Sequence, residues 1–204
     1  MTLQIVRFED VKPQPWRNGG GVTRELLAWP NADNWVMRLS VADIERDGPF
    51  SAFVGIDRWF AVLTGSGVRL GASQRAVVEG DAPVYFDGAA APACTLIDGP
   101  TRDLNLMIRR DTAVGWIKRV ASGVAWEPST HASDTTNDLF GVFTLNGCTL
   151  HRNGQDAVDL PAMSLAWSVN VKSSESWRVS DGDSDHATFA FQCTTMSSET
   201  SRNV

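Results

Sequence analysis

Short runs of alternating apolar and polar residues recur along the chain, and each run predicts a β-strand. Clear examples are residues 22–29, 35–41 and 103–109, because a period of two places successive side chains on opposite faces of a strand. Residues 59–63 have few polar positions, which is typical of a strand buried on both faces. No long stretch has a helical period. The pattern therefore predicts an almost all-β chain, with helix in less than about a fifth of the residues against the usual third.

Glycine-rich turns separate the predicted strands, and the most prominent turn lies within residues 16–25. There Asn18 precedes three glycines, and Thr23, Arg24 and Glu25 follow on the next strand. Glycine adopts positive φ and lets the backbone come close to another group. Taken alone, this segment favours an ordinary hairpin turn and an edge strand with a solvated face. Two further strands with polar residues favour a binding site instead.

The two halves of the chain resemble one another weakly. Residues 60–70 and residues 140–150 share the order of a β-rich run, a glycine turn and a second short run. Such a repeat favours two related β-units over one unrepeated sheet, and short strands separated by turns are typical of a sandwich or barrel. We therefore predict two packed β-barrel or jelly-roll-like units, residues 1–112 and 113–204, with strands that intertwine between the units.

Composition and charge narrow the classes of partner. The chain of 204 residues is 43% hydrophobic and 21% charged, with a formal net charge of -6. No basic stripe offsets that charge, which argues against nucleic acid as the main partner. We see no amino-terminal apolar run with a cleavage site and no apolar run of membrane-spanning length, so we expect neither export nor membrane insertion. The three widely spaced cysteines fit reduced thiols. We therefore expect a cytoplasmic protein with no membrane partner.

Polar residues on three of the predicted strands, together with the glycine turn, are candidates for a small-molecule site. Arg presents a planar fork that grips a carboxylate with two hydrogen bonds, and an Asn amide both donates and accepts. The alternative is a surface sheet with one solvated face, but polar strand faces are costly to bury without a ligand or partner. The predicted ligand-binding residues are Asn18, Thr23, Glu25, Arg38, Ser40, Asn105, Met107 and Arg109.

Five segments in the first half of the chain together resemble the HutD family, also called Ves, of the cupin superfamily. They are residues 16–25, 38–40, 47–51, 55–58 and 103–107. The resemblance implies a double-cupin architecture and a regulatory role in bacterial histidine utilisation, where the family is described as binding intermediates such as N-formylglutamate. On this expectation Arg38 or Arg109 holds a ligand carboxylate, Asn105 holds an amide or formyl oxygen, and Glu25 positions an Arg or accepts a ligand N–H.

The arrangement of histidines argues against a metal cofactor. Metal-binding cupins usually carry two histidines, spaced His-x-His, ahead of a Gly-x-Gly turn, and the segment ahead of Gly65 has none. The histidines that the chain does have, His131, His151 and His186, are interpreted as surface residues. The acidic residues around His186 lack the distal Glu of a calcium loop. We therefore expect no metal and no other cofactor.

The same candidate residues are compatible with two functions, ligand binding and catalysis. A carboxylate pair formed by Glu25 with Asp57 or Asp103 is conceivable for acid–base chemistry. Neighbouring Arg residues would keep such carboxylates ionised, which suits support of an Arg better than proton transfer. The sequence therefore favours a metal-free protein that binds a small carboxylic acid. A homodimer of this chain is compatible with that interpretation. The alternative is a cupin-fold hydrolase or isomerase acting on a small amino-acid-derived acid.

Overall fold

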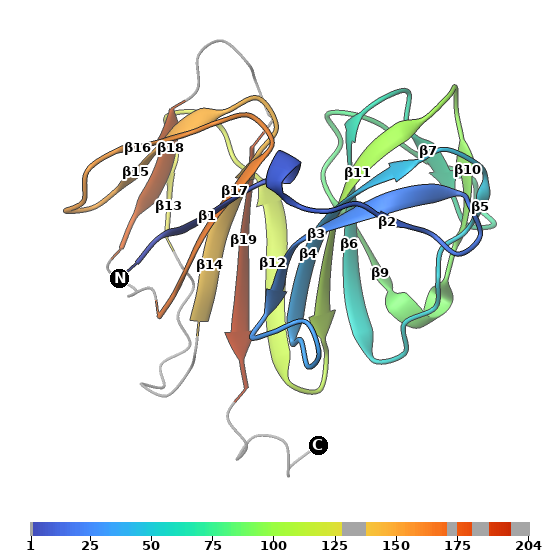
Figure 1. The fold of residues 1–204 in the computed structure, drawn as a ribbon, viewed down its shortest axis with the longest axis horizontal. Helices are drawn as coiled ribbons and strands as arrows, with labels where there is room; N and C mark the ends of the chain where they lie inside the picture. The colour runs from blue at the N-terminus through green and yellow to red at the C-terminus, as the bar shows by residue number, and fades with distance from the viewer. Residues whose placement is uncertain (1, 128–137, 171–174, 181–187, 197–204) are drawn as a thin grey trace. The chain divides into compact units, whose positions relative to one another are not determined.

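Strands form almost all of the regular structure of the chain (Figure 1). The structure is a computed structural model that describes residues 2–127, 138–170, 175–180 and 188–196. Within these residues the helices are two short 3-10 turns, η1 (Phe8–Asp10) and η2 (Gly88–Ala90). The prediction of an almost all-β chain is therefore confirmed. None of the helices in the described part of the chain is long and apolar enough to cross a membrane.

The chain divides into two compact units. The N-terminal unit is Val11–Asp111, and the C-terminal unit combines Met1–Asp10 with Thr112–Val204. The division at residues 112 and 113 expected from the sequence therefore differs from this one over the first ten residues and at Thr112. Strand β1 (Gln4–Arg7) pairs with β17 (Ser164–Val169) and so joins the C-terminal unit. Alternation in so short a run shows that a strand forms, but it does not show which sheet receives that strand.

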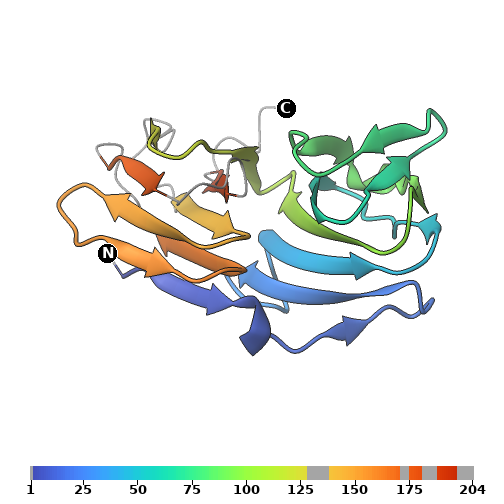
Figure 2. The same ribbon diagram turned by 90° about the horizontal axis from the view of Figure 1, so that it is seen from above.

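The N-terminal unit is built from two antiparallel sheets. Figure 2 shows the blue strands of the larger sheet and the green strands of the smaller sheet on different sides of this unit. The six-stranded sheet has the order β2 (Gln14–Pro15), β3 (Gly21–Trp29), β4 (Met37–Ile44), β11 (Thr101–Arg109), β6 (Ile56–Thr64), β9 (Val84–Asp87). The four-stranded sheet has the order β5 (Gly48–Pro49), β10 (Ala93–Leu96), β7 (Val68–Leu70), β8 (Arg75–Val77).

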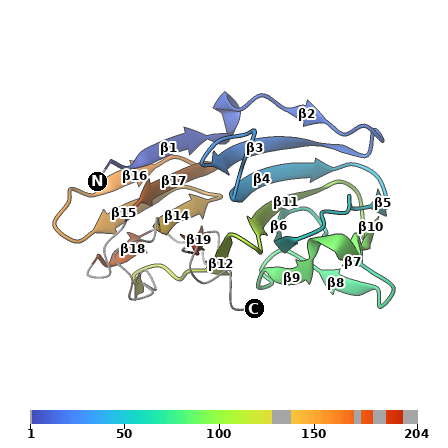
Figure 3. The same ribbon diagram turned by 90° about the horizontal axis from the view of Figure 1, so that it is seen from below.

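The C-terminal unit also consists of two sheets, whose strands are labelled in Figure 3 except for β13, which Figure 1 labels. The five-stranded sheet has the order β1, β17, β14 (Asp138–Thr144), β19 (Thr188–Thr195), β12 (Ala113–Arg119). The four-stranded sheet has the order β13 (Ala125–Trp126), β18 (Trp177–Ser180), β15 (Cys148–Arg152), β16 (Val158–Leu160). In the described residues each unit therefore has two open sheets and not the closed barrel that was one of the expected forms.

The two units share one strand order. The series β4-β11-β6-β9 corresponds to β12-β19-β14-β17, and β5-β10-β7-β8 corresponds to β13-β18-β15-β16. The glycines of the two matching turns, Gly67 and Gly147, both have φ of 88°, a backbone conformation that favours glycine. Because topology and turn geometry agree, positions in one unit can be matched to positions in the other through the sheet registers.

This matching reveals a difference between the interiors of the two units. Ser40 lies opposite Asn105, which lies opposite Phe60. In the C-terminal unit Trp116 lies opposite Gln192, which lies opposite Phe140. Trp116 therefore occupies the position of Ser40, and its ring packs against Phe140 at 6.0 Å between centroids. A bulky, half-buried indole therefore stands in the C-terminal unit at the position where the N-terminal unit has a small, buried hydroxyl.

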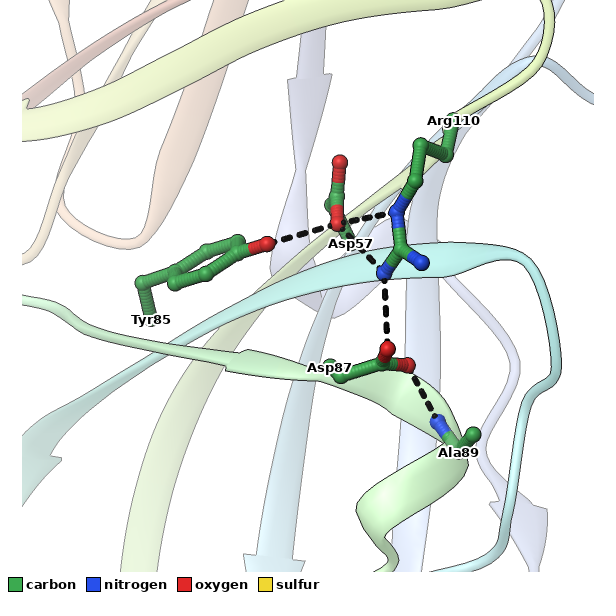
Figure 4. Close-up of polar contacts among 5 residues, drawn as sticks. All are labelled: Asp57, Tyr85, Asp87, Ala89 and Arg110. Atoms are coloured by element: carbon green, nitrogen blue, oxygen red, sulfur yellow. Dashed lines mark hydrogen bonds and ion pairs between the residues drawn. The ribbon is translucent and has the colours of Figure 1, made fainter.

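A polar cluster ties the ends of three strands in the N-terminal unit (Figure 4). One carboxylate oxygen of Asp57 accepts from the Tyr85 hydroxyl at 2.8 Å and lies 2.7 Å from Nη2 of Arg110. The same Arg110 nitrogen lies 3.1 Å from Asp87, whose other oxygen accepts from the Ala89 N–H at 2.8 Å. Because Tyr85 donates to Asp57, ionisation of the phenol is disfavoured and its pKa is raised. These side chains do not line the cavity described below.

Candidate functional site

A cavity of about 760 Å³ lies in the N-terminal unit. Its wall comes from β2 and the turn that follows it, from β3, β4, β6 and β11, and from the end of β5 with the segment that follows it. Six of the eight residues predicted from the sequence line it. These six are Asn18, Thr23, Arg38, Ser40, Asn105 and Met107. The strands supply them by parity, since alternate residues of β4 and of β11 point to the same side of the sheet.

Glu25 does not line the cavity but holds a residue that does. One of its oxygens lies 2.7 Å from Nε of Arg38. The angle at that nitrogen makes the contact an ion pair without a well-aligned hydrogen bond. Both side chains are largely buried, at 23% and 19% exposure. Glu25 thus has the position expected of a residue that orients an Arg.

Arg109 lies outside the cavity wall. Its guanidinium stacks over the ring of Trp35 at 5.7 Å, and its Nε lies 3.4 Å from the Trp35 carbonyl oxygen. Arg109 is the last residue of β11, so its side chain meets the segment that precedes β4. The alternation of β11 correctly placed Arg109 on the same face as Asn105 and Met107. It could not show that the cavity ends before Arg109 is reached.

Arg58 is the principal residue of the cavity that sequence reasoning missed. It is 4% exposed, and the centroids of the Phe50, Phe53 and Phe86 rings lie 5.1, 5.5 and 5.1 Å from its guanidinium carbon. Burial lowers the pKa of Arg58 to about 10, so the group remains a cation at neutral pH. The signal in the sequence was an Asp-Arg pair at the start of a largely apolar strand that follows two Phe residues.

Arg58 begins a chain of hydrogen bonds along the floor of the cavity. Its Nη2 donates to Oδ1 of Asn105 at 2.8 Å, and Nδ2 of Asn105 donates to Oδ1 of Asp103. Asp103 is 1% exposed. Burial disfavours its charged form and raises its pKa well above the usual value for a carboxyl. Asp103 therefore lines the cavity without behaving as an ordinary surface carboxylate.

The glycine turn closes one side of the cavity. Oδ1 of Asn18 accepts from the Gly20 N–H at 3.0 Å, and the Trp16 indole N–H donates to Thr23 Oγ1 at 2.7 Å. A side chain at Gly21 would overlap the backbone carbonyl of Asp43 on the neighbouring strand. Glycine at this position therefore allows β3 to pair closely with β4 beside the cavity.

We expect Gly21→Ala to destabilise the chain by about 1–3 kcal/mol, since an added methyl would push β3 away from β4. The measurement is the free energy of unfolding from denaturant titration, with Gly48→Ala as a matched control. An added Cβ at Gly48 would meet a single atom, at 3.9 Å, so that change is expected to stay within about 0.5 kcal/mol. Equal effects of the two substitutions would contradict the assigned role of Gly21.

Within the described residues, neither His151 nor the three cysteines supply an obvious reactive group. His151 contacts Ser180 Oγ at 2.8 Å, while His131 and His186 lie outside the described residues. No three His, Cys, Asp or Glu side chains gather as a metal site in the described part of the chain. The thiols are free and buried, and burial raises the pKa of Cys94 and of Cys193 to about 12. The absence of a metal stays a prediction.

The sequence is similar to curated bacterial proteins over about half of its length. A Pseudomonas putida protein, described as an uncharacterized 21.2 kDa protein in the hutC 3' region, is 41% identical over 110 residues, which are 52% of this chain and 57% of that protein. Protein Ves of Cronobacter sakazakii is 36% identical over 112 residues, 52% of this chain and 62% of Ves. The matched part is therefore less than two thirds of either relative.

Solved structures share the fold over nearly the whole chain. HutD from Pseudomonas fluorescens SBW25 has a TM-score of 0.79 at 24% identity, covering 96% of this chain and 100% of HutD. A mutant of the Bacillus subtilis oxalate decarboxylase has a TM-score of 0.55 at 10% identity, covering 94% of this chain and 76% of the enzyme. These likenesses establish a cupin-like all-β fold. The HutD family model matches residues 8–187, and the chain therefore belongs to the HutD family.

Proposed function

We propose that this protein binds a small carboxylic acid in the cavity of the N-terminal unit and acts as a regulator linked to histidine utilisation. The observation that carries the proposal is the charge of the cavity wall. Three Arg side chains, from Arg17, Arg38 and Arg58, line it against the single buried acid Asp103. Such a wall favours an anion, and a guanidinium fork matches a carboxylate.

Arg38 is the residue we assign to the ligand carboxylate. Glu25 holds the Nε edge of its guanidinium. Because Arg38 is already restricted before the ligand arrives, its side chain loses less conformational entropy on binding. Arg58 is already engaged with Asn105 and with the Ser51 carbonyl. It supplies a fixed positive charge beneath the cavity, while Arg38 supplies the contact.

Asn105 is assigned to an acceptor oxygen of the ligand. Because Arg58 only donates, it fixes Oδ1 of Asn105 toward itself and turns Nδ2 toward Asp103. One of the two N–H groups on Nδ2 remains for the ligand. A formyl or amide oxygen suits that donor, so N-formylglutamate is the ligand we propose. The hut-region relative and the HutD structure support the link to histidine utilisation.

The expected affinity follows from ligand size. A small dicarboxylate has about a dozen heavy atoms, and at roughly 0.5 kcal/mol per atom it would bind with about 6 kcal/mol, in the tens of micromolar.

The matching strand orders of the two units support a further proposal. We propose that they represent two cupin units, of which only the N-terminal one binds ligand.

We expect Arg38→Ala to weaken binding of N-formyl-L-glutamate about thirtyfold, because loss of a charge-assisted contact costs about 2 kcal/mol. Calorimetric titration of the wild type and the variant measures this change, with L-glutamate and urocanate as comparison ligands. Arg69→Ala is the matched control, since Arg69 is exposed on β7.

Two further arms separate the alternatives. Arg109→Ala would reduce affinity similarly only if the sequence-based site were correct, because Arg109 stacks on Trp35 away from the cavity wall. Product analysis by NMR after long incubation, with and without divalent metal, would reveal turnover if the protein were a hydrolase or isomerase. Unchanged affinity in Arg38→Ala would contradict the proposed cavity.

A further inference from the structure

The floor of the cavity contains a carboxyl group whose surroundings differ from those of an ordinary ligand-binding acid. Asp103 receives one hydrogen bond, from Asn105 to its Oδ1. Its Oδ2 is buried and has no hydrogen-bond partner among the residues that the structure describes. The orientation of Asn105 is fixed from its other side by Arg58, so the amide cannot turn to serve both oxygens of Asp103.

No ion pair within the described residues involves Asp103. The amide of Asn105 stands between it and Arg58, so the guanidinium influences Asp103 without contacting it directly. A buried carboxylate with an unpartnered oxygen is costly, because one hydrogen bond does not replace the water that it loses. The protonated acid carries no net charge and loses far less on burial.

Charged and titratable groups approach Asp103 from each neighbouring strand. Arg58 from β6 favours the ionised form, whereas Asp43 from β4 favours the protonated form. Arg38, also from β4, is paired with Glu25, and its positive charge lowers the pKa of Arg58 slightly. The Cys94 thiol of β10 lies close enough to be affected by Asp103. Asp47 acts on Cys94 as well. Burial is the largest influence on Asp103 and raises its pKa.

We propose that Asp103 is a neutral carboxylic acid at neutral pH and that anion binding in this cavity depends on that proton. Loss of the proton to solvent would place a negative charge beside Asn105 and Arg58, where it would repel a bound carboxylate and offset the charge of Arg58. Asp103 is thus a positioning residue that acts through Asn105. The part concerning the ligand rests on the proposed function, while the protonation state does not.

Stability should depend on pH in a defined direction. The folded state holds the proton of Asp103 more tightly than the unfolded chain, whose Asp ionises near pH 4. Stabilisation from this group is therefore complete below about pH 4 and declines as pH rises toward the folded-state pKa. Within that window the folding equilibrium constant of the wild type should fall about tenfold per pH unit relative to Asp103→Asn, which has no proton to lose.

The direct test uses protein labelled with ¹³C at the Asp carboxyl carbons. The Asp103 resonance is assigned by its absence in Asp103→Asn and followed from pH 4 to pH 10. Asp98→Asn is the matched control, since Asp98 is an exposed carboxyl of the same unit. We expect Asp103 to remain at the shift of a protonated acid at pH 7, and we expect Asp98→Asn to leave that resonance in place. An ionised Asp103 at pH 7 would overturn the proposal.

Binding supplies the second test. N-formyl-L-glutamate is titrated into the wild type and Asp103→Asn at pH values on either side of the Asp103 midpoint found by NMR. The wild type should lose affinity about tenfold across that midpoint, whereas Asp103→Asn should show no such step. Equal pH profiles across the midpoint would contradict the dependence on the proton. If the probe binds neither protein at any pH, the proposed ligand fails, and the NMR and stability measurements still decide the state of Asp103.

Discussion

Ser40→Trp is expected to weaken ligand binding in the N-terminal unit at least about a hundredfold, equivalent to about 2.7 kcal/mol. Ser40 is buried and lines the cavity. At the matching position of the C-terminal unit, the half-buried Trp116 packs on the buried Phe140. The two units have the same strand order, and one of them already carries a tryptophan at this position. We therefore expect the N-terminal unit to tolerate a tryptophan at position 40, where the indole would occupy the cavity.

Calorimetric titration with N-formyl-L-glutamate measures the loss, and circular dichroism verifies that the β-spectrum persists. Arg69→Trp adds the same side chain at an exposed position of β7 and should bind as the wild type does. Should Ser40→Trp fail to fold, Ser40→Leu provides a smaller obstruction for the same measurement. A folded Ser40→Trp that binds with wild-type affinity would show that ligand does not enter this cavity.

Trp177→Ala should destabilise the protein by about 3–5 kcal/mol, the largest stability effect we predict. Trp177 is fully buried. Its ring meets Phe140 edge-on at 4.9 Å, and the Arg152 guanidinium lies 5.7 Å from it. Removal of the indole leaves a space that the surrounding strands cannot close. Their positions are fixed by the pairing of β18 with β15 and of β19 with β14.

Denaturant unfolding monitored by far-ultraviolet circular dichroism measures this change. Trp116→Ala is the matched control on the same phenylalanine, since Trp116 is only half-buried. We expect the control to cost less than half as much. If both changes had equal effects, the core of the C-terminal unit would not centre on Trp177.

Local sequence chemistry identified most of the candidate site. Period-two alternation in β4 and β11 placed Arg38, Ser40 and Asn105 on faces that do line the cavity. The asparagine and glycines before β3 predicted a tight turn, which is observed beside the cavity. These features are local, because parity and positive φ depend on a few neighbouring residues.

The remaining features depended on contacts between distant segments. Arg58 is a buried cation because three phenylalanines from other segments surround it. Arg109 lies outside the cavity wall because it is the last residue of β11, where its side chain contacts Trp35. The orphaned oxygen of Asp103 likewise follows from tertiary packing.

The sequence by itself determined that the chain is almost all β, which faces of its strands are polar, and where its glycine turns lie, because those properties follow from the period and conformational freedom of short segments. Tertiary structure decided that β1 joins the C-terminal unit, that Ser40 lines a cavity while Trp116 at the matching position packs on Phe140, and that Asp103 is cut off from solvent. Burial and desolvation depend on every strand around a residue, and no local pattern in a single chain encodes them.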